Sequence, residues 1–303
     1  MGVSEIPTSA GVYDGINEKA YHGDRGSLSV SGAKLLLPPS CPAKFRHAMD
    51  NPQPAKRIFE FGHFVHLKVL GQGPKVVMID ADSYRTKAAR DARDEARKGG
   101  NIPVLAGNPN DDAAAELEQA EAMTAAVFAH PASAPLFESG ASEQSMYTTD
   151  AETGVRLRGR ADRITAVDDR LILVDLKTAT TANPAELQRK FWQLGYHMQA
   201  AWYRQMVIDL GLSDDPDFLF VVVDKAKPHL VTVLRYTDAA IEEGGRLNRQ
   251  AIDLYAECHA SGMWPGYTDT ITTLDLPRWA YPRTTNSNDD LMAALETYLQ
   301  ESA

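Results

Sequence analysis

The chain has 303 residues and a net charge of −10, a length sufficient for one large domain or two small ones. The negative charge argues against non-specific binding to nucleic acid or to anionic membranes through bulk charge. Cys41 and Cys258 are the only cysteines, too few for a disulfide framework, a four-cysteine zinc site or a cysteine-ligated iron–sulfur cluster. We therefore expect a protein of the reducing cytoplasm, with no signal peptide and no segment that crosses a membrane.

The first half of the chain is predicted to be mainly helical, after an irregular segment that reaches about residue 27. Ser29 and Ser31 are N-cap residues for a short helix through Leu37, and Pro42 suits the first turn of a second one. Further helices are expected over residues 57–70, 84–98, 113–129 and 131–137, with a short strand at 75–79.

The helix predicted over residues 84–98 carries Arg90, Arg93 and Arg97 at helical spacing. Such a stripe is either a solvated face balanced by the neighbouring acidic residues or a contact with a nucleic-acid backbone.

The second half of the chain alternates strands and helices. Strands are expected at 143–149, 155–161, 218–224 and 229–236, the last two as an antiparallel pair. Helices are expected at 184–211, with a break at Gly195, at 238–261 and at 289–301. Helices before and after a mostly antiparallel run of strands indicate an α/β or α+β fold, whose mixed central β-sheet carries helices on both faces.

The stretch from Gly159 to Lys177 predicts a β-hairpin. Two apolar, β-branched runs flank a short polar break at Asp168-Asp169, which we take as the turn. This register places Val167 opposite Arg170 and fixes every other facing pair.

The same register places Asp162 opposite Asp175, and Arg160 opposite Lys177. Residues two apart on a strand share a face, so all four charged side chains are expected on one face. Directly opposite Cβ atoms are about 4.5–5.5 Å apart, and like charges at that distance are destabilising. A divalent cation such as Mg²⁺ between the two carboxylates would resolve this conflict. The alternative is a solvent-facing hairpin with ordinary surface charges, although both strands are too apolar for a fully wet one.

His63 and His66 share a face of the helix predicted over 57–70. Each is either a core residue with its hydrogen bonds satisfied or, for one of them, an imidazole that joins the two carboxylates around a metal. No matching cluster of cysteine or histidine supports zinc.

Four motifs, in this order, resemble the PD-(D/E)xK nuclease superfamily in its RecB/RecE-like branch. They are a G-x-x-x-H helix from Gly62 to His66, a first acidic motif from Gly159 to Asp162, the D-x-K motif Asp175-Leu176-Lys177, and Q-x-x-x-Y from Gln199 to Tyr203. Ala161 stands where proline is common in the family. More narrowly, Ser29-x-Ser31, residues 41–45 and residues 277–279 resemble the RecE-type phage exonucleases.

The resemblance implies a restriction-endonuclease-like core. Residues 57–303 would form the nuclease domain, with a helical insertion at about 80–138, and residues 1–56 would form a helical segment packed on it.

The resemblance also implies roles for individual residues. The metal ligands would be His66, Asp162, Asp175 and the carbonyl of Leu176, with Glu143 as an extra acid for a second ion. One or two Mg²⁺ or Mn²⁺ ions would be bound.

Lys177 would lie beside the attacking water and stabilise charge on the phosphate, as a compact and mobile point charge can. Gln199 and Tyr203 share a helical face, and they and Arg160 would orient the site or contact the DNA backbone. Ordinary helix packing is the alternative for Gln199 and Tyr203, and packing is the better interpretation of His63.

These observations predict a metal-dependent DNA exonuclease that digests linear double-stranded DNA in the 5′-to-3′ direction. Its 3′ single-stranded tails would pass to a single-strand annealing protein for recombination. The resemblance implies a homo-oligomeric ring, no membrane association, and the host cytoplasm if the protein is phage-encoded. An endonuclease or structure-specific nuclease, or a catalytically idle DNA-binding or assembly protein, remain alternatives.

Overall fold

The computed structural model describes residues 5–51, 61–71, 75–99, 101–106, 108 and 112–281. The chain divides into two units, residues 1–265 and residues 266–303. The predicted helix over 289–301 lies outside the described residues. In the second unit the described residues include a short 3₁₀ helix, η1, at Arg278–Ala280.

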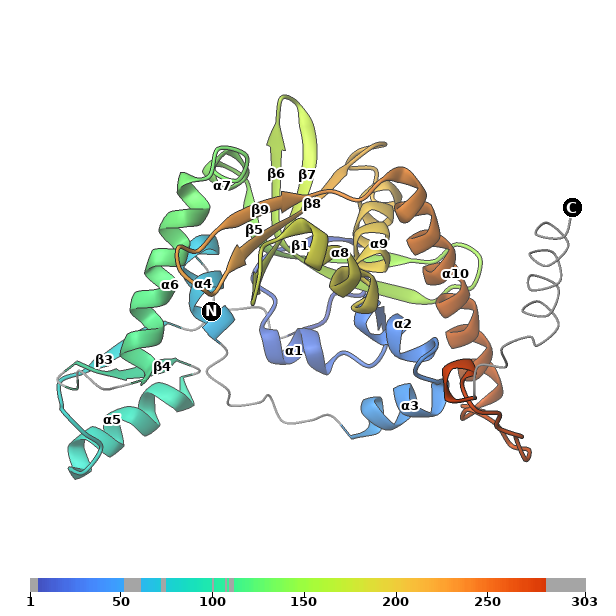
Figure 1. The fold of residues 1–303 in the computed structure, drawn as a ribbon, viewed down its shortest axis with the longest axis horizontal. Coiled ribbons are helices and arrows are strands. Elements are labelled where there is room, and N and C mark those ends of the chain that lie inside the picture. The colour runs from blue at the N-terminus through green and yellow to red at the C-terminus, as the bar shows by residue number, and fades with distance from the viewer. Residues whose placement is uncertain are drawn as a thin grey trace, which may run out of the picture. The chain divides into compact units, whose positions relative to one another are not determined.

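A mixed seven-stranded sheet organises the first unit (Figure 1). Its strands follow the order β1-β5-β6-β7-β8-β9, and β2 pairs with β6. Pairing is parallel in β7–β8 and β2–β6 and antiparallel in the other pairs of the sheet. The strands are β1 Gly11–Tyr13, β2 Leu28–Ser29, β5 Ala141–Thr149, β6 Arg156–Val167, β7 Arg170–Ala179, β8 Asp217–Asp224 and β9 Val231–Leu234.

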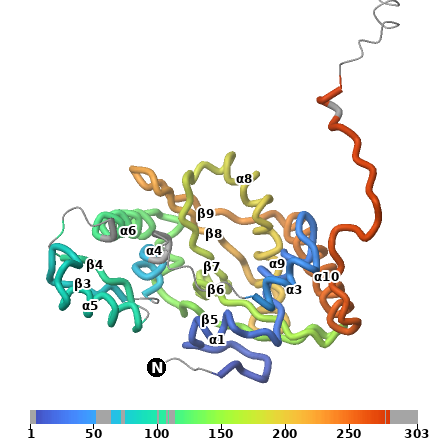
Figure 2. The backbone as a smooth tube through the Cα atoms, turned by 90° about the horizontal axis from the view of Figure 1, so that it is seen from below, coloured from blue at the N-terminus to red at the C-terminus, as the bar shows by residue number. Residues whose placement is uncertain are grey.

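Helices cover both faces of this sheet, as predicted (Figures 1 and 2). Alternation along β8 shows the two faces: Phe218, Phe220 and Val222 belong to one buried cluster, and Val221 and Val223 belong to the other. The first cluster is completed by α2 Val30–Leu36, α3 Pro42–Asp50, α8 Pro184–Gln193, α9 Tyr196–Asp209 and α10 Asp238–Ser261. The second is completed by α4 Phe61–Leu70, α6 Asp112–Ala129 and α7 Pro135–Glu138.

The region predicted as a helical insertion, at about 80–138, also contains a strand, β4 Ile102–Leu105. β3 Val76–Ile79 and β4 form a two-stranded parallel sheet, and α5 Lys87–Lys98 lies between them in the chain. The strand at 75–79 was predicted, whereas β4 was not.

The prediction of an irregular segment up to about residue 27 was wrong in part. This segment contains β1 and α1 Glu18–Gly23, and β2 follows it directly. Their strands find partners far away in sequence, with β1 beside β5 and β2 beside β6.

The predicted break at Gly195 is confirmed, because this residue lies between α8 and α9 with a φ of +63°. That left-handed conformation favours glycine. Among the described residues, no helix is both long and apolar enough to cross a membrane.

Candidate metal centre and active site

The predicted hairpin register is confirmed at its turn end. β6 and β7 pair from Val167 with Arg170 to Arg163 with Val174. Asp168 and Asp169 have φ values of +50° and +63°, which suits a two-residue hairpin turn.

Beyond those pairs the hairpin prediction was wrong, because Asp162 and Asp175, and Arg160 and Lys177, are not in the ladder. The reason is that the Asp162 side chain takes over a hydrogen bond of β7: its Oδ2 accepts from the Leu176 N–H at 2.8 Å. Farther along β6, the edge that β7 leaves is paired in parallel with β2, at Leu157 and Arg158, while β5 pairs along the opposite edge.

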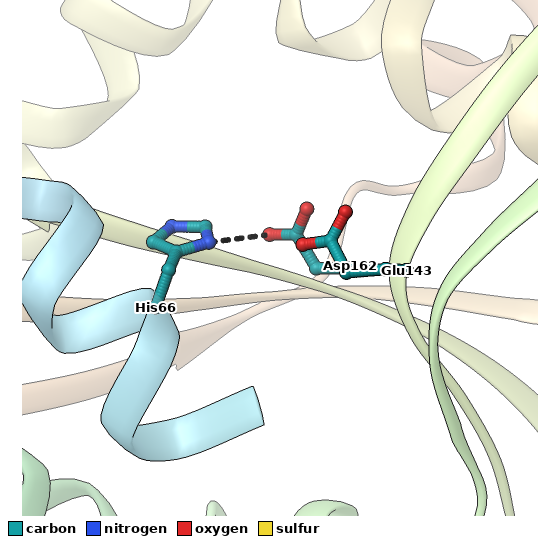
Figure 3. A group of neighbouring side chains, drawn as sticks. All are labelled: His66, Glu143 and Asp162. Carbon is teal, nitrogen blue, oxygen red and sulfur yellow. Dashed lines mark ion pairs between the residues drawn. The ribbon is translucent and has the colours of Figure 1, made fainter. Parts of the chain in front are cut away.

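A cluster of three possible metal ligands lies where the two strands separate. His66 on α4, Glu143 on β5 and Asp162 on β6 each offer one ligand atom, and these atoms lie within 4.8 Å of one another. Figure 3 shows the His66 imidazole directed at the two carboxylates. The sequence predicted all three as ligands but assigned Glu143 to a second ion, whereas the structure places it with the other two.

His66 is held by the backbone of β7. Its Nε2 lies 2.8 Å from the Leu176 carbonyl, which can only accept, so Nε2 carries the proton. In the neutral imidazole the lone pair is then on Nδ1, which lies 3.8 Å from Asp162 Oδ2 and faces the cluster. A neutral imidazole with one nitrogen anchored in this way is a typical metal ligand.

Glu143 reaches the cluster through an unusual backbone conformation. Its φ is +54°, and the ladder between β5 and β6 skips it, pairing Ser142 with Arg163 and Gln144 with Ala161. A non-glycine residue in the left-handed region is uncommon and is often found at a functional site.

A positive charge at the cluster would stabilise the charged forms of its two carboxyl groups. Burial and the nearby Asp162 raise the pKa of Glu143 to about 7. Burial and the repulsion of Asp175 raise the pKa of Asp162, although His66, Lys177 and the Leu176 N–H oppose the shift. Two carboxyl groups and an imidazole fit a divalent cation such as Mg²⁺ or Mn²⁺, and the cation would supply the missing charge.

Asp175 lies beside this cluster and is bound by other side chains. It is 5% exposed, its Oδ2 is 2.6 Å from Lys177 Nζ, and its Oδ1 accepts a 2.6 Å hydrogen bond from Gln199 Nε2. Burial opposes the charged form of Lys177, but Asp175 and Asp162 more than offset it, so the pKa of this lysine is raised. The structure thus brings together the predicted residues Asp175, Lys177 and Gln199, but Asp175, predicted as a metal ligand, is not among the three clustered ligand residues.

Tyr203 and Arg160, predicted to contact substrate, both bond within the protein. The Tyr203 hydroxyl donates to the Arg160 carbonyl at 2.8 Å and accepts from its N–H at 3.1 Å. It therefore braces β6 two residues before Asp162. The Arg160 guanidinium donates to Ser145 Oγ and to the Ile16 carbonyl. A contact of either residue with DNA stays a prediction.

The arginine stripe of α5 is bonded locally at two of its three positions. Arg90 donates to the carbonyls of Tyr84 and Arg85, and Arg93 pairs with Asp94 at 2.9 Å. These contacts favour the solvated-face interpretation. The side chain of His63 lies outside the described part of the chain.

The comparisons with known proteins agree with this geometry. Residues 29–277 match a family described as "PDDEXK-like domain of unknown function (DUF3799)". The chain belongs to this family. No curated protein matches the chain.

One solved structure shares the fold of this chain. A crystal structure of a protein from Eubacterium rectale, described as a "Putative exonuclease", has a TM-score of 0.53 at 11% identity and covers 86% of this chain and 93% of its own. A second structure, SSO0001, has a TM-score of only 0.28 at 14% identity, covering 64% of this chain and 85% of its own.

Membership of a PDDEXK-like family connects the residues of the site with a known nuclease motif. Asp162, Asp175 and Lys177 are the residues that the sequence predicted as the acidic residues and the lysine of the motif, and PDDEXK nucleases are typically dependent on divalent metal. Lys34 and Tyr196 also border the site, since Tyr196 lies 5.2 Å from Lys177 Nζ and 5.3 Å from Lys34 Nζ. Neither residue was singled out from the sequence, because no local pattern indicates that α2 meets the start of α9.

Proposed function

We propose that this protein is a metal-dependent DNA exonuclease that digests one strand of linear duplex DNA from its 5′ end. The observation that carries the proposal is the cluster of His66, Glu143 and Asp162 beside the Asp175–Lys177 pair. A metal site next to a buried, charged lysine suits hydrolysis of a phosphodiester, whose transition state gains negative charge.

Each residue of the site has a distinct role in this proposal. His66, Glu143 and Asp162 would hold Mg²⁺ or Mn²⁺, and the bound ion would activate water and neutralise charge on the phosphate. Lys177 stabilises the developing negative charge on the phosphate oxygens. Asp175 keeps Lys177 protonated and in place, and Gln199 fixes the orientation of Asp175 through its hydrogen bond.

Two observations support an exonuclease rather than an endonuclease. The protein from Eubacterium rectale, described as a "Putative exonuclease", shares the fold over most of both chains. The motifs at residues 29–31, 41–45 and 277–279 resemble those of RecE-type phage exonucleases. By the same resemblance, we propose a homo-oligomeric ring that acts in the cytoplasm and passes its 3′ single-stranded product to an annealing protein.

A digestion assay tests the proposal. Linear duplex labelled at the 5′ or the 3′ end, and a covalently closed circle, are incubated with Mg²⁺ or Mn²⁺. We expect digestion of the linear duplex only, with the 5′ label released first. Asp162→Ala, Asp175→Ala and Lys177→Ala should abolish cleavage, whereas Lys98→Ala, at a lysine whose side chain is 77% exposed on α5, should not.

The outcomes separate the alternatives. Full activity in any of the three site variants would overturn the assignment of the site. Cleavage of the closed circle would identify an endonuclease. If neither metal supports cleavage of any substrate, the protein is an idle DNA-binding or assembly protein.

A further inference from the structure

Lys34, on α2, brings a second lysine to the active site. Its Nζ lies 5.3 Å from the centroid of the Tyr196 ring, and Lys177 Nζ lies 5.2 Å from the same centroid. The two ammonium groups thus lie near the same aromatic ring. The face of the ring carries a negative potential, which attracts each ammonium group. Within the described part of the chain, no hydrogen bond or ion pair to Lys34 Nζ is formed.

The fold holds Lys34 in this position from two sides. Ser29 caps α2 by accepting from the Gly32 N–H at 3.3 Å, and Ser29 itself lies in β2, beside the strand that carries Asp162. On the other side, a Cβ at Gly195 would lie only 3.2 Å from Lys34 Cε and 3.3 Å from its Cδ. The aliphatic part of Lys34 therefore packs on the glycine that separates α8 from α9.

The charges around Lys34 do not balance. Lys177 Nζ lies 2.6 Å from Asp175 Oδ2, so this carboxylate already has an ion-pair partner. Burial, and next the repulsion of Lys177, lower the pKa of Lys34 to about 8, against the weaker opposing effect of Asp175. A partly buried cation without an ion-pair partner is costly, and an anion that bound there would remove this cost.

We propose that Lys34 binds a backbone phosphate of the DNA strand that enters the active site, adjacent to the phosphate that is cleaved. The inference rests on the proposed function, which supplies a polyanion at this place. A phosphodiester suits the site because a lysine ammonium is a compact point charge that needs no fixed geometry of its partner. Lys177 is paired with Asp175 and Lys34 is not, so each lysine can serve a different phosphate.

Binding without catalysis tests the proposal. The affinity for a blunt DNA duplex is measured by fluorescence anisotropy in EDTA, over a series of KCl concentrations, so that no cleavage occurs. Lys34→Met removes the charge and keeps the aliphatic chain over Gly195. We expect about tenfold weaker binding at low salt. We also expect the slope of log K against log[salt] to be smaller in magnitude by about 0.9, the value for one phosphate contact on duplex DNA.

Two further variants make the comparison specific. Lys34→Arg keeps the charge and should retain the salt slope of the wild type. Arg246→Gln removes one charge from an exposed part of α10, where Arg246 pairs with Glu243 at 2.7 Å, and should leave affinity and slope unchanged. Thermal unfolding of each variant shows whether it is folded, and Lys34→Gln replaces Lys34→Met if that protein does not fold.

Kinetics give the second measurement. Loss of a phosphate contact made equally in substrate and transition state raises KM about tenfold and leaves kcat nearly unchanged. An unchanged affinity and salt slope in Lys34→Met, or no DNA binding by the wild type, would overturn the inference. Failure of the proposed function is distinguishable, because a wild type that binds DNA but cleaves none still reports the effect of Lys34 on the salt slope.

Discussion

The ion pair between Lys177 and Asp175 gives a prediction that separates stability from catalysis. Asp175 is 5% exposed and the Lys177 side chain 26% exposed, and their charged atoms are 2.6 Å apart. Lys177→Met leaves a buried carboxylate with only the hydrogen bond from Gln199. Removing one partner of a fully buried pair costs about 3–5 kcal/mol. Because Lys177 is partly exposed, we expect about 2–4 kcal/mol of the free energy of unfolding to be lost.

The matching change removes the second charge. Asp175→Asn keeps the shape of the side chain and can still accept from Gln199 through its amide oxygen. The double variant Lys177→Met/Asp175→Asn buries no unpaired charge, and should therefore be more stable than Lys177→Met alone. The coupling free energy between the two positions should be about 1.5–3 kcal/mol.

Urea unfolding in EDTA measures these values, with the fluorescence of the buried Trp202 on α9 as a probe. Lys98→Met is the control, because Lys98 pairs with Glu95 at 3.7 Å where both side chains are exposed, and its loss should cost less than about 0.5 kcal/mol. A coupling below about 0.5 kcal/mol would refute the reasoning. Loss of cleavage in Lys177→Met under conditions where that variant is still folded would show that the lysine is needed for the chemistry itself.

Two further predictions concern the metal cluster and the packing of the helices. The pKa of Glu143 is raised from 4.5 to about 7 in the folded protein, so its contribution to metal-free stability is fully present below pH 4.5 and is lost as the pH rises through 7, by up to about 3 kcal/mol. Mn²⁺ should therefore raise the unfolding temperature more at pH 8 than at pH 6. If Mn²⁺ raised the unfolding temperature of Glu143→Gln as much as that of the wild type at pH 8, this would count against Glu143 as a ligand. Gly244→Ala should cost about 1–3 kcal/mol, because its Cβ would lie 2.3 Å from the His197 carbonyl oxygen. Gly245→Ala, with no atom within 4 Å, should gain up to about 1 kcal/mol, and equal effects at both positions in urea unfolding would contradict this packing.

The features predicted well depend on local patterns. The helix over 238–261 was predicted at both ends, because Thr237 caps its start through the Ala240 N–H and Gly262 ends it at a φ of +71°. The hairpin turn at Asp168-Asp169 was predicted for the same reason, since a polar pair between two apolar runs is a local signal. The structure brings together the motif residues Asp175, Lys177 and Gln199. This is because the connection that follows β7 places α9 on the sheet face where Asp175 and Lys177 lie.

The features that were missed depend on contacts between distant segments. β2 pairs with β6, and only the strand pattern of β6 is visible locally, because a strand of two residues has no periodicity of its own. The separation of β6 from β7 follows from one side chain, that of Asp162, which accepts from the Leu176 N–H. The left-handed conformation of Glu143 is equally hidden, since glycine rather than glutamate is the usual signal of a positive φ.

The backbone of Leu176 explains why the acidic residue and the lysine of the motif are separated by one residue. Side chains two apart on a strand share a face, so Asp175 and Lys177 both lie toward α9. The side chain of Leu176 lies on the opposite face, where it is fully buried in the cluster that includes α4 and α6. Its N–H holds Asp162 and its carbonyl holds His66, so one peptide segment orients two of the proposed metal ligands and is itself fixed by the core. A longer or shorter spacing would move either the charged pair or this anchor to the wrong face of the sheet.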